Sequence, residues 1–299
     1  MTNKGVSSRC SYNNEAPVQH RQCKESKHMP DLDAVIRVME ICNPLMDPVA
    51  RAGIRALRLP AGSRGLDAGC GIGMQAVLLA EAVGTGGRVT GLDICPAFLR
   101  RAEKTARESD LTDRISYREG DVSLLPFEDG AFDWAWSSDC VGYSFALEPL
   151  SAVKELARVV KPGGAVALFA WSSEKLLPGH PRLEARLDAT ASGIAPFAAG
   201  MPPERHFLRA LGWMRDAGLV ECTARTFAGG AHAPLTDDYR AALIALFAMR
   251  WTGCEAELSD EDRSEHRRLC TPESPDFIVN HPDYYAFFTW SLFHGRVPS

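Results

Sequence analysis

The sequence predicts an α/β fold, a doubly wound sheet of seven strands that is mostly parallel, with an antiparallel strand near the C-terminus. Short apolar runs alternate with amphipathic helical stretches through residues 61–172, and a glycine-rich turn joins the first run to a helix. Alternation at this spacing argues for right-handed βαβ units with helices on both faces. The chain has 299 residues, of which 45% are hydrophobic, enough for a sizeable core.

The N-terminal region is expected to hold an arm and two helices. Residues 1–30 are polar with little periodicity, which predicts a flexible arm. Asp31 is a good N-cap for the first helix, and Pro44 is expected to end it. A second helix is expected from Pro48 to the Pro60-Ala61-Gly62 turn. We interpret residues 31–299 as one domain, with these helices at 31–60.

Residues 61–172 are expected to form the ligand-binding core. Its strands are predicted at Gly65–Ala68, Arg88–Leu92, Ile115–Glu119, Phe132–Ser137 and Val166–Trp171. Its helices are predicted at Met74–Val83, Pro96–Ser109 and Pro149–Val160. Lys161-Pro162-Gly163-Gly164 is expected to separate the last helix from the last strand. Trp134 and Trp136 share a strand face with Phe132, and core packing is expected for them.

The C-terminal half is expected to add two strands and a helical lid. Residues 173–235 and 236–283 are interpreted as insertions on the ligand side of the sheet, and residues 284–299 as a terminal strand. The predicted elements are a helix from Glu204 to Gly218, a strand at Leu219–Phe227, helices capped by Thr236 and Ser259 in a lid at Thr236–Cys270, and a strand at Ala286–His294. The aromatic tail is expected to finish the core, with one or two members in a pocket. Its members are Tyr284, Tyr285, Phe287, Phe288, Trp290 and Phe293.

Composition excludes several classes of function. The net charge is −5 and no basic stripe is present, which argues against a nucleic-acid partner. The longest apolar stretches are too short to span a bilayer, and the polar N-terminus does not resemble a signal peptide. Nine cysteines lie scattered without a C-x-x-C pair, which predicts reduced cytoplasmic thiols rather than disulfides or a metal site. Whether the protein forms a homodimer is left open.

The strongest local signal is the run from Gly65 to Gly73, Gly-Leu-Asp-Ala-Gly-Cys-Gly-Ile-Gly. A strand enters a glycine-rich turn and a helix follows directly, so backbone N–H groups can approach a ligand closely. A dinucleotide-binding loop would carry its third glycine where this chain has Met74, which weakens an interpretation as an NAD site. No Gly-Lys-Ser/Thr follows, which excludes a P-loop.

Four motifs in order resemble the class I S-adenosylmethionine-dependent methyltransferases. Leu66–Gly73 fits their first motif, and Asp93 ends the next strand 20 residues after Gly73, a spacing typical of an acid that binds ribose. Gly120-Asp121-Val122 follows the third strand. Leu125-Pro126-Phe127, Asp133 and Lys161-Pro162-Gly163-Gly164 are similar to the ubiquinone- and menaquinone-pathway enzymes.

The resemblance implies a Rossmann-like fold, S-adenosylmethionine as cofactor and S-adenosylhomocysteine as product. By this resemblance, Asp93 is expected to bind the ribose hydroxyls, Ile94 to pack on the adenine, and Asp121 to accept from the adenine amino group. The implied cofactor-binding residues are Asp67, Ala68, Gly69, Cys70, Gly71, Gly73, Asp93, Ile94, Asp121, Val122 and Ser137. The implied activity is methyl transfer to nitrogen, oxygen or carbon of a small molecule, in biosynthesis. The alternatives are an NAD-type oxidoreductase and a non-catalytic member that binds the cofactor for regulation.

Asp139 and Tyr143 are the candidate catalytic residues on the acceptor side, because they follow the fourth strand. Ser137-Ser138-Asp139-Cys140 resembles the Ser-Arg-Asp segment of phosphoethanolamine-type N-methyltransferases, with Ser138 in place of Arg and Tyr143 in place of His. Alternatively, Asp139 only caps the next helix. No residue pair identifies a general base. The lid and the mild acidity suit a small apolar or cationic acceptor.

Overall fold

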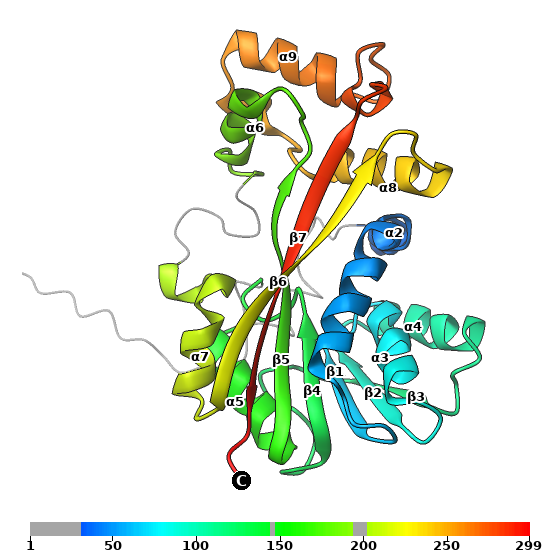
Figure 1. Cartoon of the computed structure of the whole chain (residues 1–299), viewed down its shortest axis with the longest axis vertical. Coiled ribbons are helices and arrows are strands. Elements are labelled where there is room, and N and C mark those ends of the chain that lie inside the picture. The colour runs from blue at the N-terminus through cyan, green and yellow to red at the C-terminus, as the bar shows by residue number, and fades with distance from the viewer. Residues whose placement is uncertain (1–30, 144–146, 194–201) are drawn as a thin grey trace, which may run out of the picture.

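A computed structural model describes residues 31–143, 147–193 and 202–299. Its seven-stranded sheet has the order β3-β2-β1-β4-β5-β7-β6 (Figure 1). β7 runs antiparallel to both of its neighbours, whereas β1 to β5 pair in parallel, so the predicted fold is confirmed. The strands are β1 (Arg64–Ala68), β2 (Arg88–Asp93), β3 (Ile115–Glu119), β4 (Phe132–Ser138), β5 (Val160–Lys175), β6 (Val220–His232) and β7 (Tyr285–Arg296).

Helices cover both faces of the sheet. The helices α2 (Leu32–Leu57), α3 (Met74–Val83) and α4 (Pro96–Glu108) pack on one face, and α5 (Pro149–Val159) and α7 (Ala210–Asp216) lie on the other (Figure 1). The strand order reverses between β1 and β4. In doubly wound sheets such a reversal leaves a crevice at the carboxyl ends of the strands, where ligands bind.

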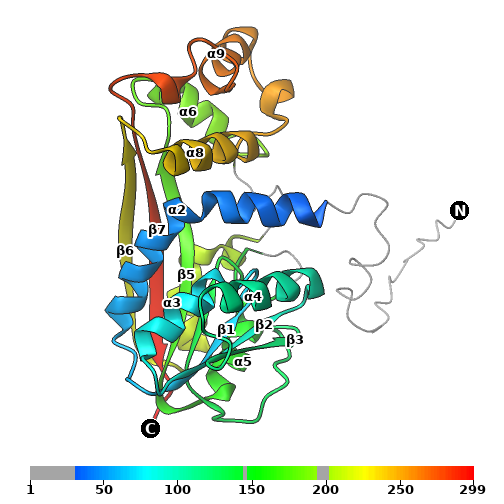
Figure 2. The same cartoon turned by 90° about the vertical axis from the view of Figure 1, so that its right-hand side faces the viewer.

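The N-terminal helical region is one helix rather than the two predicted. Pro44 and Pro48 both lie inside α2, and Figure 2 shows the ribbon changing direction along its length. Proline removes a helix hydrogen bond and bends the axis, which a helix tolerates when packing compensates. Here the second half of α2 buries Leu45, Val49 and Ile54 against the sheet. Asp31 caps the helix as predicted, accepting from the N–H of Asp33. The predicted arm, residues 1–30, lies outside the described residues.

The predicted break at residues 161–164 is also wrong, because these residues belong to β5. Phe132 pairs with Val160 and Trp134 with Ala165, so an irregularity in the ladder absorbs the extra residues. Phe132 packs in the apolar cluster under α5. Trp134 and Trp136 pack on the opposite face, so the expected shared face is wrong although all three are buried.

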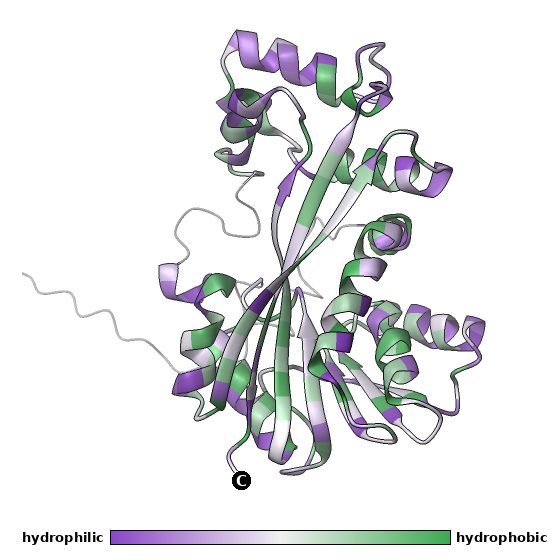
Figure 3. Ribbon diagram, in the orientation of Figure 1, coloured by the Kyte–Doolittle hydropathy of each residue, from purple (hydrophilic) through white to green (hydrophobic). Residues whose placement is uncertain are grey.

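A helical layer stands at the far end of the long strands β5, β6 and β7 (Figure 1). It contains α6 (Pro181–Asp188), α8 (Asp237–Met249), α9 (Asp260–Cys270) and the short turns η3 (Cys254–Glu257) and η4 (Ile278–Asn280). Figure 3 shows hydrophilic residues concentrated on α9, the outermost helix. The side chains of Thr236 and Ser259 cap α8 and α9 as predicted. Among the described residues, no helix combines the length and apolar character needed to span a membrane.

The helix predicted from Glu204 is divided into three pieces. Two short turns, η1 (Pro203–Arg205) and η2 (Phe207–Arg209), precede α7. The backbone of His206 is extended, and its ring accepts a hydrogen bond from the N–H of Leu208. His206 therefore ends one turn and caps the next, which a periodicity argument does not detect.

Candidate functional site

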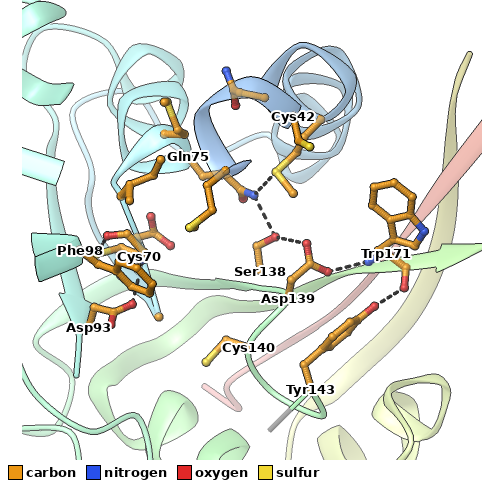
Figure 4. A pocket seen from close by; sticks show the side chains of 18 of the residues that line it. Cys42, Cys70, Gln75, Asp93, Phe98, Ser138, Asp139, Cys140, Tyr143 and Trp171 are labelled. Carbon is orange, nitrogen blue, oxygen red and sulfur yellow. Dashed lines mark hydrogen bonds between the residues drawn. The ribbon is translucent and has the colours of Figure 1, made fainter. Parts of the chain in front are cut away.

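A cavity of about 490 Å³ opens at the carboxyl ends of β1, β2 and β4, on the side where α2 lies (Figure 4). Its walls come from α2, the glycine turn after β1, the start of α3, the end of β2 and the segment after β4. Its lining residues are Val38, Met39, Cys42, Asn43, Met46, Asp67, Gly69, Cys70, Gly71, Ile72, Met74, Gln75, Asp93, Phe98, Ser138, Asp139, Cys140, Tyr143, Trp171 and Met249. We call it the proximal cavity.

The glycine turn has no room for side chains. Gly69, Gly71 and Gly73 have φ values of +77°, +52° and +78°, in the left-handed region. A Cβ at Gly69 would lie 2.6 Å from the sulfur of Cys140, and one at Gly73 would lie 2.5 Å from the hydroxyl of Tyr117. Because these positions have no side chain, the turn can pack closely against Cys140 and Tyr117, and its backbone lies at the cavity.

Two acids at the strand ends face this turn. The Oδ2 atom of Asp93 accepts from the N–H of Gly71 at 2.9 Å, and its Oδ1 atom accepts from Cys95 at the same distance. Burial raises the pKa of Asp93. Asp67 is 1% exposed, and its Oδ2 atom has no hydrogen-bond partner among the described residues. Burial, and then the charge of Asp93, raise the pKa of Asp67 to about 8.

These features fit a cationic ligand with polar hydroxyls. No Lys, Arg or His is among the described residues of the proximal wall, whereas three acids are. An unpartnered buried carboxylate oxygen is costly unless a ligand supplies a donor or a positive charge. The glycine turn, together with Asp67 of β1 and Asp93 at the end of β2, can therefore hold a cation that bears amino and hydroxyl groups.

The structure brings seven of the predicted site residues to the cavity wall and leaves six outside it. Asp67, Gly69, Cys70, Gly71, Asp93, Asp139 and Tyr143 line the cavity, and Ala68, Gly73, Ile94, Asp121, Val122 and Ser137 do not. The hydroxyl of Ser137 donates to the carbonyl of Ala68 inside the sheet. The carboxylate of Asp121 accepts from the N–H of Ser123 in its own turn. Ile94 is 44% exposed.

Sequence reasoning missed Gln75, at the start of α3. Its Nε2 atom donates to the hydroxyl of Ser138 at 2.9 Å (Figure 4). Its Oε1 atom accepts from the indole of Trp136 at 2.7 Å. An amide among the otherwise apolar residues of the first turns of α3 was the available signal. Gln75 thus joins the glycine-turn side of the cavity to the segment after β4.

Asp139 lies on the opposite wall, with a left-handed backbone (φ +46°). Its Oδ1 atom accepts from the backbone N–H of Trp171 at 2.7 Å, and its Oδ2 atom accepts from the indole of Trp290 at 3.2 Å. Burial raises the pKa of Asp139 to about 6, against these stabilising bonds. The helix-cap alternative is wrong, because Glu148 caps α5 by accepting from the N–H of Ser151.

Tyr143 is fixed beside Asp139. Its hydroxyl donates to the carbonyl of Trp171 (Figure 4). Its ring stacks on Phe207 with centroids 5.4 Å apart. Burial and the nearby Asp139 raise the pKa of Tyr143. Tyr143 is therefore a protonated hydrogen-bond donor at neutral pH, not a base.

The cysteines at the cavity are thiols. Burial raises the pKa of Cys42 to about 11 and that of Cys140 to about 12. Since the thiolate is the reactive form, neither is a nucleophile near neutral pH. All the described cysteines are free, and among the described residues no group of three or more His, Cys, Asp or Glu could hold a metal ion.

A second cavity of about 870 Å³ adjoins the first and shares with it Asp139, Tyr143, Trp171 and Met249. We call it the distal cavity. Its other walls come from the end of β5, the segment before α7, and the C-terminal end of α8. Of the predicted lid at Thr236–Cys270, only Leu246, Met249 and Arg250 line a cavity, and α9 lines neither.

Comparison with known proteins matches the central part of the chain to one family. Residues 66–168 match the family model described as a methyltransferase domain. Demethylmenaquinone methyltransferase of Staphylococcus aureus (strain JH9) is 30% identical over 189 residues, covering 58% of this chain and 74% of that protein. The Staphylococcus epidermidis enzyme of the same name (strain ATCC 12228) is 37% identical over 123 residues, covering 40% of this chain and 48% of that protein.

Other matches are shorter or show the fold alone. A probable tocopherol O-methyltransferase of rice is 33% identical over 119 residues, covering 40% of this chain and 32% of that protein. Several of these matches thus span only a third to a half of the relative. The YcgJ protein of Bacillus subtilis has a TM-score of 0.50 at 17% identity, covering 85% of this chain and 99% of that one. A Bacillus halodurans protein has a TM-score of 0.53 at 17% identity, covering 83% and 99%.

Proposed function

The chain belongs to the class I S-adenosylmethionine-dependent methyltransferases, and from this premise we propose that it transfers a methyl group to a small-molecule acceptor. The observation that carries the proposal is the proximal cavity. It joins the glycine turn, Asp67 and Asp93 on one wall to Asp139 and Tyr143 on the other. A cofactor site and a candidate acceptor site therefore meet in one space.

The residues present fit S-adenosylmethionine. The unpartnered oxygen of Asp67 suits its ammonium group, the carboxylate of Asp93 suits its ribose hydroxyls, and the glycine turn leaves space for its chain. Ile94 and Asp121 follow the neighbouring strands β2 and β3, and we propose them for the adenine. When bound, the cofactor supplies a methyl group activated by a sulfonium. Ala68, Gly73, Val122 and Ser137 then act by shaping the turn and the strand ends.

The chain's own part in methyl transfer is to align the acceptor and exclude water. Asp139 has a pKa of about 6, so near neutral pH it is mostly a carboxylate that can accept the acceptor's hydrogen bond or proton. Tyr143 remains protonated and holds the segment in place through the carbonyl of Trp171. An amine acceptor needs only to be oriented, whereas a phenol or carbon acid also needs a base. The acceptor atom is nitrogen, oxygen or carbon.

The walls favour an apolar acceptor. Met39, Met46, Phe98 and Met249 line the proximal cavity, and methionine surfaces adapt to ligands of varied shape. The relatives named above are called methyltransferases of demethylmenaquinone and of tocopherol. The net charge of −5 argues against a nucleic-acid substrate. We propose a cytoplasmic enzyme of biosynthesis that acts on a small molecule. No described feature favours the NAD-type oxidoreductase.

Isothermal titration with S-adenosylhomocysteine, followed by turnover of S-adenosylmethionine over a panel of phenols, quinols and amines, tests the proposal. Binding in the micromolar range and methylation of at least one acceptor are expected. Absence of binding at saturating ligand would overturn the cofactor assignment. Binding without turnover of any acceptor would favour the non-catalytic alternative.

A further inference from the structure

The distal cavity is large enough for a ligand of its own. At about 870 Å³ it exceeds the proximal cavity, and it lies within the range of sites that enclose drug-sized molecules. The two cavities meet at Asp139, where the acceptor atom is proposed to lie. A small acceptor held at this junction would leave the distal space unused.

Once the ion pairs in the wall of the distal cavity are counted, the charge that remains without a partner is the carboxylate of Asp139. The Nε atom of Arg250 pairs with the Oε1 atom of Glu174, whose Oε2 atom accepts from the indole of Trp171. The Oδ2 atom of Asp188 lies 3.4 Å from the ammonium of Lys175. Asp139 has no cationic partner, since both of its oxygens accept from neutral groups.

The described wall of the distal cavity offers no other positive charge. Burial lowers the pKa of His206, so this ring is neutral near pH 7. The described lining of the proximal cavity contains Asp67 and Asp93 and no basic residue, and the raised pKa of Asp67, about 8, leaves that carboxyl mostly protonated at pH 7. Along the described wall, an anionic ligand would therefore meet Asp139, which has no cationic partner, and one cation that is already paired.

The remaining wall is apolar or carries hydroxyls. Phe207, Leu208, Leu246 and Met249 supply apolar surface, and Leu208 is 55% exposed, which is high for a large apolar side chain. Burying such surface against a ligand is favourable at about 25 cal/mol per Å². An apolar body thus gains free energy in this cavity.

We propose that the distal cavity binds the body of the methyl acceptor, and that this acceptor is bulky and either uncharged or cationic. Acceptors bearing a carboxylate or a phosphate are rejected. The inference rests on the proposed function, because it assumes that the acceptor atom lies at Asp139. It departs from the phosphoethanolamine-type resemblance of the segment after β4, since such an acceptor is small and anionic at one end.

The test uses three phenols of one shape: para-octylphenol, its analogue with a terminal carboxylate, and its analogue with a terminal trimethylammonium. Their dissociation constants are measured by calorimetry on the full chain, with and without S-adenosylhomocysteine. The carboxylate probe is expected to bind at least about tenfold more weakly than the other two, because like charges meet in a desolvated site. Equal binding of the three probes, or binding of none, would overturn the inference.

A variant that introduces a positive charge adds a second arm to the test. Leu208→Lys places a cation at the distal wall, on an exposed side chain whose replacement should not disturb the fold. In this variant, the ratio of the dissociation constant of the carboxylate probe to that of para-octylphenol is expected to fall at least about threefold. Leu124→Lys is the matched control, because Leu124 is 76% exposed and lines neither cavity. An unchanged preference in Leu208→Lys, or the same change in both variants, would count against the distal site.

The two proposals fail separately. If S-adenosylhomocysteine binds and the probes show no charge preference, the acceptor inference fails and the methyltransferase proposal stands. If the charge preference is present but S-adenosylhomocysteine does not bind, the distal site stands and the cofactor assignment fails.

Discussion

The carboxylate of Asp139 accepts a hydrogen bond from the backbone N–H of Trp171 at 2.7 Å, which ties the turn after β4 to the end of β5. Trp290 of β7 donates to the other carboxylate oxygen. One acid therefore joins three strands and also lines both cavities. Such a residue can hold the site together and contact the acceptor, and mutation can separate these two roles.

Asp139→Asn is expected to lower the turnover number by about a hundredfold, the range in which general acid–base groups act, and to change S-adenosylhomocysteine affinity little. Asn adopts the left-handed backbone readily and retains an oxygen for the Trp171 N–H, although its NH2 group can no longer accept from the indole of Trp290. The fold should therefore persist with some loss of stability. Steady-state kinetics and calorimetry on the same preparation check this. Turnover equal to wild type would assign Asp139 a purely structural role.

Asp93→Ala is expected to weaken S-adenosylhomocysteine binding by at least about tenfold, since hydrogen bonds to a charged group contribute about 1.5–3 kcal/mol each. Some stability should be lost too, because Asp93 also holds the N–H of Gly71. Glu119→Ala is the matched control: Glu119 pairs in register with Asp93 but is exposed and lies outside the cavity. A folded Asp93→Ala variant that binds as tightly as the control would contradict the assignment.

Binding of S-adenosylmethionine at pH 7 is expected to release up to about one proton from Asp67. The pKa of this carboxyl is about 8 in the unliganded protein, so it is mostly protonated at pH 7. A cation beside it lowers the pKa. Calorimetry in buffers of different ionisation enthalpy measures the release, which should vanish in Asp67→Asn. Binding heats that do not depend on the buffer would refute the prediction.

The contribution of Asp67 and Asp139 to the stability of the unliganded protein is expected to fall as the pH rises from about 4 to about 8. The pKa of Asp67 is raised on folding to about 8 and that of Asp139 to about 6. The folded state therefore binds these protons more tightly than the unfolded state. The resulting stabilisation is complete below the unfolded pKa values and disappears as the pH passes the folded ones. Urea titrations across this range should show a shallower decline in Asp67→Asn than in wild type; equal declines would mean that Asp67 does not contribute.

Gly73→Ala is expected to destabilise the fold by about 1–3 kcal/mol, because φ is +78° and the new Cβ would lie 2.5 Å from the hydroxyl of Tyr117. That hydroxyl is buried without a hydrogen-bond partner among the described residues, so Tyr117→Phe alone should cost little. Combining the two substitutions should recover part of the loss, as measured in a double-mutant cycle by urea unfolding. Strictly additive effects would show that the Tyr117 hydroxyl is not the cause and would assign the loss to the backbone conformation and to Ala102, whose Cβ atom would lie 2.9 Å from the new Cβ.

Local patterns in the sequence were sufficient for most of the elements. The strands from Arg64 to Ser138 and the helices α3, α4 and α5 lie within a few residues of their predicted positions. The helices α4 and α5 each bury one periodic apolar face, whereas β1 and α3 are short apolar runs bounded by turn residues. The glycine turn was also predictable, since its positive φ angles need glycine wherever the chain folds. Asp67 and Asp93 follow from it, because parallel strands end at one edge of the sheet.

Tertiary packing decided the rest. Burial of Val49 and Ile54 against the sheet keeps α2 a single helix through two prolines, which local propensity opposes. Gln75 meets Ser138 across 63 residues, and Trp290 meets Asp139 across 151. The distal cavity is enclosed by segments from β5, η2 and α8. The sequence by itself thus determined the elements, the family and the cofactor turn, because these depend on neighbouring residues. Only the tertiary structure decided which side chains line the two cavities, because those contacts depend on how distant segments pack.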